Sequence, residues 1–175
     1  MHNNKYFSGI LMEHQSKTDE CCPEFDPSRW DEKEFQWDNK PFVKETIPTL
    51  FHIPFPPMIG KKIRAMLKAA EDSNAAEENK AETLILFRDP GAFRSEIYLS
   101  VKGVVKGREN TFLSGSYIGK AYSGGFNSVP KFIRQTNAYL AAKGMKAKDY
   151  MVHYAYCPGC EKKYGNNYLV LFAKV

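Results

Sequence analysis

The sequence predicts an α+β protein made of two pseudo-symmetric βαββ units, with an antiparallel sheet, helices on one face of it and a cleft between the halves. Two observations support this prediction. Segments typical of strands and helices follow one another in the order strand, helix, strand, strand, and this order occurs twice. The 175 residues, of which 43% are hydrophobic and 26% charged, are typical of one globular domain or two small fused halves.

The first 41 residues precede this pattern. Residues 1–20 are polar and aperiodic, and we expect a loose tail. Residues 21–41 combine proline, aspartate and tryptophan without a clean period, which indicates an ordered but irregular arm. Trp30, Phe35 and Trp37 are too apolar to remain in water, so the arm should pack on the body of the protein.

The body is expected to span residues 42–175, with its first half at about 42–105. A β-branched and aromatic segment comes first, and the apolar residues after it recur at the intervals of an amphipathic helix. An Asp-Pro-Gly turn then separates two further strands. The predicted elements are a strand at 49–53, a helix at 58–72, and strands at 82–88 and 93–101.

The second half is expected at about residues 106–175. Ser128 is a plausible N-cap, Pro130 lies in the first helical turn, and Gly144 ends the helix. The predicted elements are a strand at 111–122, a helix at 128–143, a strand at 150–156, a loop at 158–165 and a final strand at 168–175.

Charge and hydropathy exclude several classes of partner. The net charge is +5, and the basic residues are scattered among acidic ones, whereas a nucleic-acid binder usually concentrates its positive charge in one stripe. There is no apolar run of about 18 residues, so no membrane partner is expected. The N-terminus does not resemble a signal peptide, so a cytoplasmic location is expected.

The segment LSGSYIGKAYSGGFNSVPKFIRQTNAYLAAKGM, at 113–145, resembles the GyrI-like small-molecule-binding family, which has a duplicated βαββ fold of the SHS2 type. Its features are a strand that ends in an aromatic residue and a small-residue turn, then a helix that ends at a Lys-Gly break. The resemblance covers about residues 42–175. The segments CCPEFDPSRWD, FQWDNKPFVK and YCPGCEKKYGNNYLVLFAKV resemble a stand-alone bacterial branch of that family.

The resemblance implies a cleft between the halves that is lined by aromatic residues and contains a buried carboxylate. Family members serve as effector-sensing domains of regulators, as drug-binding proteins, as a gyrase inhibitor, and as hydrolases of cyclopropane-bearing alkylating compounds. No helix-turn-helix segment is evident here, so a stand-alone protein is expected. The glutamate that related proteins carry in the strand after the second helix is missing from YMVHYAYCP, which weakens a direct transfer of the hydrolase mechanism.

Glu96 is the candidate acid. It alternates with Ile97 and Leu99 in a predicted strand, so it should face the cleft if those residues pack under the helices. Burial there raises the pKa of a carboxyl group unless a cation is near. The carboxylate would pair with a cationic ligand or, in an enzyme, activate water. An exposed glutamate on an edge strand is an equally good interpretation.

The ten tyrosines suggest a lined cavity, because a buried tyrosine needs a partner for its hydroxyl group. His52 is out of phase with its apolar neighbours in a predicted strand, and we expect it to face the cleft, with Trp37 as a lid from the arm. Each of these residues is also explained as an ordinary structural residue. The candidate wall residues are Tyr98, Tyr117, Tyr122, Tyr154 and Tyr156.

Cys157 and Cys160 form a C-x-x-C motif with turn residues between them, which suits two thiolates on one metal ion. Cys21 and Cys22 would complete a structural zinc site if the arm folds back. Free or oxidised thiols are the main alternative. Thioredoxin-type redox chemistry needs the motif at the start of a helix, and the following segment looks too short for one.

Three functions remain open. The first is binding of a hydrophobic or cationic small molecule in the cleft. The second is hydrolysis of electrophilic, cyclopropane-type compounds, with Glu96 as the catalytic residue. The third is a protein-interaction module, which the evenly mixed charge does not favour. None of them requires a cofactor.

Overall fold

The computed structural model describes residues 21–54 and 56–175 and confirms the α+β class. The strands are β1 (Lys33–Leu50), β2 (Ile53–Pro54), β3 (Ile85–Gly91), β4 (Arg94–Ser100), β5 (Glu109–Ser123), β6 (Asp149–Tyr154) and β7 (Tyr168–Lys174). The α-helices are α1 (Pro56–Asp72), α2 (Val129–Ala142) and α3 (Pro158–Tyr164). Short 3₁₀-helices occur at Pro27–Arg29, Lys80–Glu82 and Phe126–Ser128.

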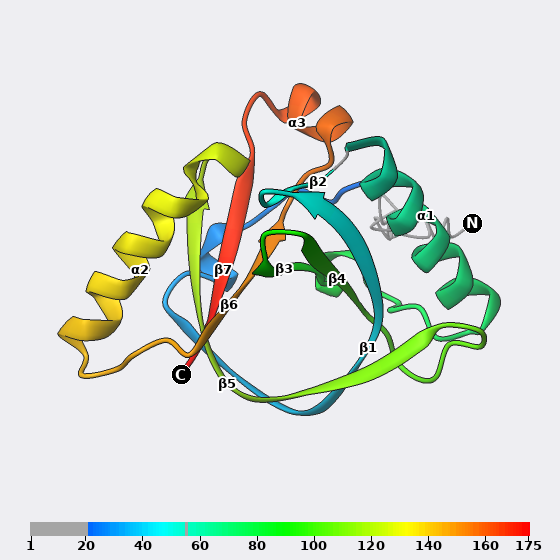
Figure 1. Cartoon of the computed structure of the whole chain (residues 1–175), viewed down its shortest axis with the longest axis horizontal. Coiled ribbons are helices and arrows are strands. Elements are labelled where there is room, and N and C mark those ends of the chain that lie inside the picture. Colours follow the sequence, from blue (N-terminus) through cyan, green and yellow to red (C-terminus); the bar gives the residue numbers. More distant parts are fainter. Residues whose placement is uncertain (1–20, 55) are drawn as a thin grey trace, which may run out of the picture.

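The sheet closes into an antiparallel barrel, which the sequence did not predict. Six strands pair in the order β1, β4, β3, β6, β7, β5, and β5 pairs again with β1. Closure depends on the length of β1, whose first part pairs with β5 while its later part pairs with β4. A β-bulge between Trp37 and Lys40, within the pairing with β5, bends the strand. Figure 1 shows β1 and β5 curving together around the lower side of the barrel.

The first part of β1 corrects the predicted irregular arm. Residues 33–41 are strand, although 21–32 are largely irregular. Phe35 and Trp37 alternate with charged and polar residues, and both pack against the core inside the barrel. Gly119 of β5 allows the arm to approach closely, because a Cβ atom there would lie 2.6 Å from the carbonyl oxygen of Trp30.

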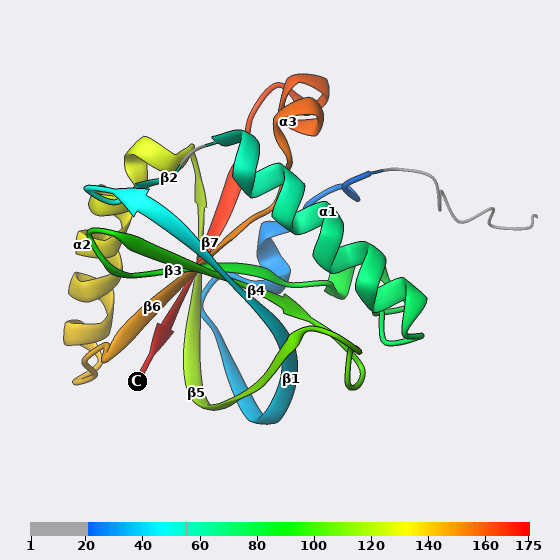
Figure 2. The ribbon, with the colours of Figure 1, turned by 45° about the vertical axis from the view of Figure 1, so that its right-hand side comes forward.

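The helices pack outside the barrel (Figures 1 and 2). α1 covers β1 and β4 with a buried stripe that includes Met66 and Ala70. α2 covers β5 and β7 through Phe132 and Leu140. The third helix, α3, replaces the loop predicted at 158–165. Pro158 in its first turn and Gly165, with a φ of 80°, at its end make two helical turns possible in seven residues.

The barrel interior is rich in aromatic side chains. Trp30 from the arm packs in the same cluster as Phe42 and Phe172, at one end of the barrel. The outward-facing residues Ile97, Leu99 and Val101 pack under α1, as the alternation in the sequence predicts. Glu96 and Tyr98 therefore point the other way, into the closed barrel rather than into an open cleft.

Candidate functional site

A groove of about 2040 Å³ lies on the outside of the barrel, over β3 and β6 and between α1 and α2. The two helices flank these strands on opposite sides (Figure 1). At one end the groove is lined by residues of α3 and by the chain after Cys21. Its apolar lining comes from both halves of the sequence and includes Ile59, Ile63, Leu67, Ile85, Phe87, Val129, Ile133, Val152 and Tyr154.

The floor of the groove is where the two halves of the barrel meet. Only two residue pairs join β3 to β6 within the described chain, and one of them is Phe87 with Val152. The ring of Phe87 meets that of Tyr154 edge-on, with 5.4 Å between the centroids. These three side chains are half-buried, because α1 and α2 lie mainly over the neighbouring strands. An apolar molecule would contact them directly.

His52 and Asp89 form a polar pair at the groove. Nδ1 of His52 lies 2.6 Å from Oδ2 of Asp89, and both side chains are largely exposed. His52 sits in the tight turn between β1 and β2, where both Phe51 and His52 have positive φ angles of 49° and 69°. This conformation is uncommon for residues with side chains. A carboxylate on one ring nitrogen of a histidine leaves the other nitrogen available as a base.

His153 and Tyr154 are neighbours in β6, and the pKa of each side chain is strongly shifted. Burial lowers the pKa of His153 to about 4, although a contact of its Nδ1 with the carbonyl oxygen of Ile85, 3.1 Å away, opposes the shift. Burial raises the pKa of Tyr154 to about 12. Both groups are therefore neutral near pH 7.

Glu96 lies in the barrel interior and is only 3% exposed. Its carboxylate accepts a hydrogen bond of 2.7 Å from the Tyr98 hydroxyl group and one of 3.0 Å from Arg88. Lys44 lies 3.3 Å away and Arg94 3.5 Å away. Burial alone would raise the pKa of Glu96, but Tyr98 and the nearby cations outweigh it and lower the pKa. The protein's own side chains thus supply the nearby cation that a buried carboxyl group needs if its pKa is not to be raised.

Arg88 connects this interior cluster to the groove. Its Nε donates to Asp149 at 2.6 Å while Nη1 donates to Glu96, and both Arg88 and Asp149 line the groove. Glu96 is not among the groove-lining residues. Sequence reasoning missed Arg88, whose signal was a lone cation in the otherwise apolar strand segment LILFR.

The structure divides the sequence-predicted aromatic residues among three places. Tyr98, Tyr117 and Trp37 lie inside the barrel, where Trp37 packs on Tyr117 with 4.2 Å between ring centroids. Tyr122 lies under α2, where its hydroxyl group is 2.9 Å from Oγ1 of Thr136. The predicted residues that line the groove are His52, Tyr154 and Tyr156.

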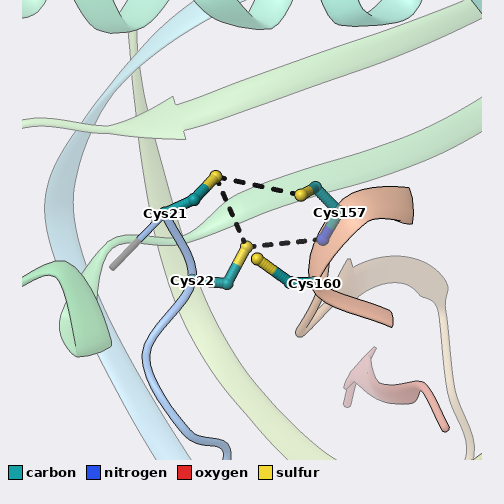
Figure 3. A group of neighbouring side chains, drawn as sticks. All are labelled: Cys21, Cys22, Cys157 and Cys160. Carbon is teal, nitrogen blue, oxygen red and sulfur yellow. Dashed lines mark hydrogen bonds between the residues drawn. The ribbon is translucent and has the colours of Figure 1, made fainter. Parts of the chain in front are cut away.

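The four cysteines converge, as Figure 3 shows. Their Sγ atoms all lie within 4.8 Å of one another. Cys21 is 3.8 Å from Cys157 and 4.0 Å from Cys22 between sulfur atoms, and the backbone N–H of Cys157 donates to Cys22 Sγ at 3.4 Å. None of the four is joined in a disulfide. The cluster is compatible with a metal site.

The start of α3 corrects one premise about these thiols. Cys157 is the N-cap of α3, so the C-x-x-C motif does begin a helix. Burial raises the pKa of Cys157, but hydrogen bonds from the backbone N–H groups of Cys160 and Gly159 and from neighbouring thiols lower it to about 7. The absence of a helix is therefore no longer a reason against redox chemistry.

Comparisons with known proteins show which family the chain belongs to. The comparison with curated proteins finds no match. Within the described residues, none of the helices has the length and apolar character needed to span a membrane. The model of a protein family described as "Bacterial hydrolase" matches residues 12–175, which is nearly the whole chain. The chain therefore belongs to this bacterial hydrolase family.

Proposed function

We propose that the protein binds a hydrophobic small molecule in the groove between α1 and α2. The supporting observation is the groove itself, whose half-buried apolar floor at Phe87 and Val152 is flanked by two helices. Ligand sites in proteins are typically concave, mostly apolar and equipped with a few polar groups. The polar groups here are the His52–Asp89 pair and the Arg88–Asp149 pair.

The volume of the groove indicates how much of it a ligand would occupy. At about 2040 Å³ it exceeds the roughly 300–1,000 Å³ typical of small-molecule sites. A drug-sized molecule would fill part of it, over β3 and β6, where side chains from both halves are in reach. Eight carboxylates line the groove against five lysine and arginine side chains, and this balance favours a neutral or cationic molecule over an anionic one.

Dye binding tests this proposal. Nile red, a neutral hydrophobic dye, and ethidium, a planar cation, are titrated against the full chain and followed by fluorescence. Ile63→Gln places an amide on the groove wall and should weaken binding about tenfold, whereas Lys61→Gln on the exposed face of the same helix should not change it. Equal affinities of the two variants, or no saturable binding by the unmodified protein, would contradict the proposal.

Hydrolysis of a bound electrophile is the second candidate function, and the family description supports it. Within the groove, the His52–Asp89 pair is arranged as a general base that deprotonates water. Glu96, the base indicated by the sequence, contacts the groove only through Arg88, so in this proposal it acts by positioning that guanidinium group.

Turnover separates the two candidates. A small amount of protein is incubated with an excess of a cyclopropane-bearing alkylating compound, and water adducts are quantified by mass spectrometry. Multiple turnovers support hydrolysis, and tight saturable binding without product supports binding alone. Loss of turnover in His52→Gln with only a partial decrease in Glu96→Gln assigns the base to the groove, and the reverse assigns it to the barrel interior.

The GyrI-like relationship is part of the same proposal. The order β1, α1, β3, β4 followed by β5, α2, β6, β7 supports a duplicated unit, since β1 pairs with β5 and β3 pairs with β6. A cytoplasmic protein that binds neither nucleic acid nor membrane remains part of this proposal, and the scattered charges, which form no basic stripe, support the absence of nucleic-acid binding.

A further inference from the structure

We infer that Cys21, Cys22, Cys157 and Cys160 form a closed zinc site that fastens the N-terminal segment to α3. This site adjoins one end of the proposed ligand groove, which Cys21, Cys22 and Cys157 also line, but it does not depend on what the groove binds. It rests on the positions of four sulfur atoms that come from segments 135 residues apart.

The sulfur geometry fits a tetrahedral ion. With Zn–S bonds of about 2.3 Å, neighbouring sulfur atoms of a tetrahedron are about 3.8 Å apart. The separations of 3.8 Å and 4.0 Å from Cys21 to its two neighbours match this spacing, and all four sulfur atoms remain within 4.8 Å. A redox pair needs two converging thiols, so it leaves the other two unexplained.

The donor set indicates zinc in a structural role. Four thiolates are soft ligands that select zinc or iron over magnesium and calcium. Because all four positions of a tetrahedron are filled by protein, no position remains for water or substrate, and the ion holds the chain together rather than acting on a substrate. The N–H group of Cys157 that donates to Cys22 Sγ is the kind of hydrogen bond that supports a thiolate ligand.

The site would hold a segment that already makes specific contacts. The backbone N–H of Phe25 donates to the Tyr156 hydroxyl group at 2.9 Å, and the Phe25 ring stacks on Tyr168. The hydroxyl group of Tyr164 donates to the carbonyl oxygen of Cys22 at 3.4 Å. The same segment leads to Trp30 in the barrel core. Zinc would therefore secure both the end of the groove and the chain that enters the barrel.

Metal analysis of the unmodified full chain tests the inference. Protein purified without added zinc should contain about one zinc ion per chain by elemental analysis. Titration with a mercurial thiol reagent should release that zinc only as the four thiols react. Cobalt added to the metal-free chain should give the visible bands of a tetrahedral thiolate complex. Iron instead of zinc, four freely reactive thiols with no metal, or a disulfide found by mass spectrometry would each overturn the assignment.

Two variants connect the metal to the segment. Cys160→Ser should lose the zinc and become several-fold more sensitive to proteolysis before Trp30, whereas Lys162→Ser on the same helix should retain both properties. If Cys160→Ser fails to fold, the same proteolysis is measured on the unmodified protein before and after chelation. Unchanged cleavage after complete zinc removal would contradict the fastening role. Nile red binding and its response to Ile63→Gln test the groove independently of this result.

Discussion

The barrel interior and the groove outside it use aromatic and ionisable side chains in opposite ways. Inside, Glu96 is enclosed by Tyr98 and three cations. Across the described residues, no buried side-chain nitrogen or oxygen lacks a hydrogen-bond partner. In the groove, Phe87, Val152 and Tyr154 remain half-exposed, and the His52–Asp89 pair faces solvent. A buried carboxylate in an aromatic setting is therefore not by itself a ligand site, because its partners decide whether it is available.

The largest expected effect is the loss of stability when the carboxylate in the barrel interior is removed. Glu96→Ala leaves Arg88 and Lys44 without their shared buried partner and should lower the free energy of unfolding by about 3–5 kcal/mol. Glu96→Gln should cost less, since its amide oxygen still accepts hydrogen bonds. Urea denaturation measures both variants. Glu109 also contacts Lys44 but has a 60% exposed side chain, so Glu109→Ala should cost less than about 1 kcal/mol. Equal losses for Glu96→Ala and Glu109→Ala would contradict this interpretation of the interior.

The next effect is a pH dependence at the boundary between interior and groove. The folded pKa of His153 is about 4, against 6.5 unperturbed, so the unfolded chain binds more protons between these values. Stability should therefore fall by about 3 kcal/mol as the pH drops from 6.5 to 4. The contribution of Glu96 is lost at lower pH, because its folded pKa lies below the ordinary 4.5. Urea midpoints are measured across this pH range. His153→Gln should remove most of their dependence on pH, and an unchanged dependence would assign the effect to other groups.

A smaller effect on stability is expected in the groove floor. Val152→Ala removes two half-buried methyl groups, so unfolding should become easier by less than about 1 kcal/mol. Nile red binding should weaken about three- to tenfold, because the same methyl groups contact the ligand. Val104 is 68% exposed and outside the groove, so Val104→Ala should leave dye affinity unchanged. A stability loss without a change in dye affinity would move the binding site elsewhere.

The smallest stability effect is expected at the exposed polar pair. Asp89→Asn should change the free energy of unfolding by less than about 0.5 kcal/mol, since both partners are largely in solvent. If the groove hydrolyses its ligand, the same variant should lower turnover about 100-fold, because His52 loses the carboxylate that orients its ring. Measurements of kcat and thermal stability on Asp89→Asn check this prediction. A decrease in kcat matched by a proportional decrease in stability would indicate a structural role.

The sequence predicts the individual helices and strands better than the closure of the strands into a barrel. The helix predicted at 128–143 corresponds to α2, and the alternation around Glu96 correctly places Ile97 and Leu99 under α1. Barrel closure depends on long-range pairing of β1 with β5 across a bulge, which no local period encodes. The helix α3 was missed because seven residues are too few to display a helical period.

The candidate site was predicted in part for a similar reason. Cysteine chemistry raised a zinc site that Cys21 and Cys22 would complete if the arm folded back, beside the alternative of free or oxidised thiols, and the four sulfur atoms do converge. Alternation placed Glu96 opposite the helices, but it cannot distinguish an open cleft from a closed barrel interior. The groove floor depends on which strands the helices leave partly uncovered, and that is a property of the assembled fold rather than of any single segment.

Closure of the barrel also limits how other molecules can associate with this chain. Each of its six strands pairs with a neighbour on both sides in the described structure, and the two-residue β2 pairs with the end of β1. Along most of the described barrel an extended peptide therefore finds little unpaired backbone to extend the sheet, and the exception is the contact of β3 with β6, which only two residue pairs join. Where the described strands are paired on both sides, recognition has to use side chains on the outer surface.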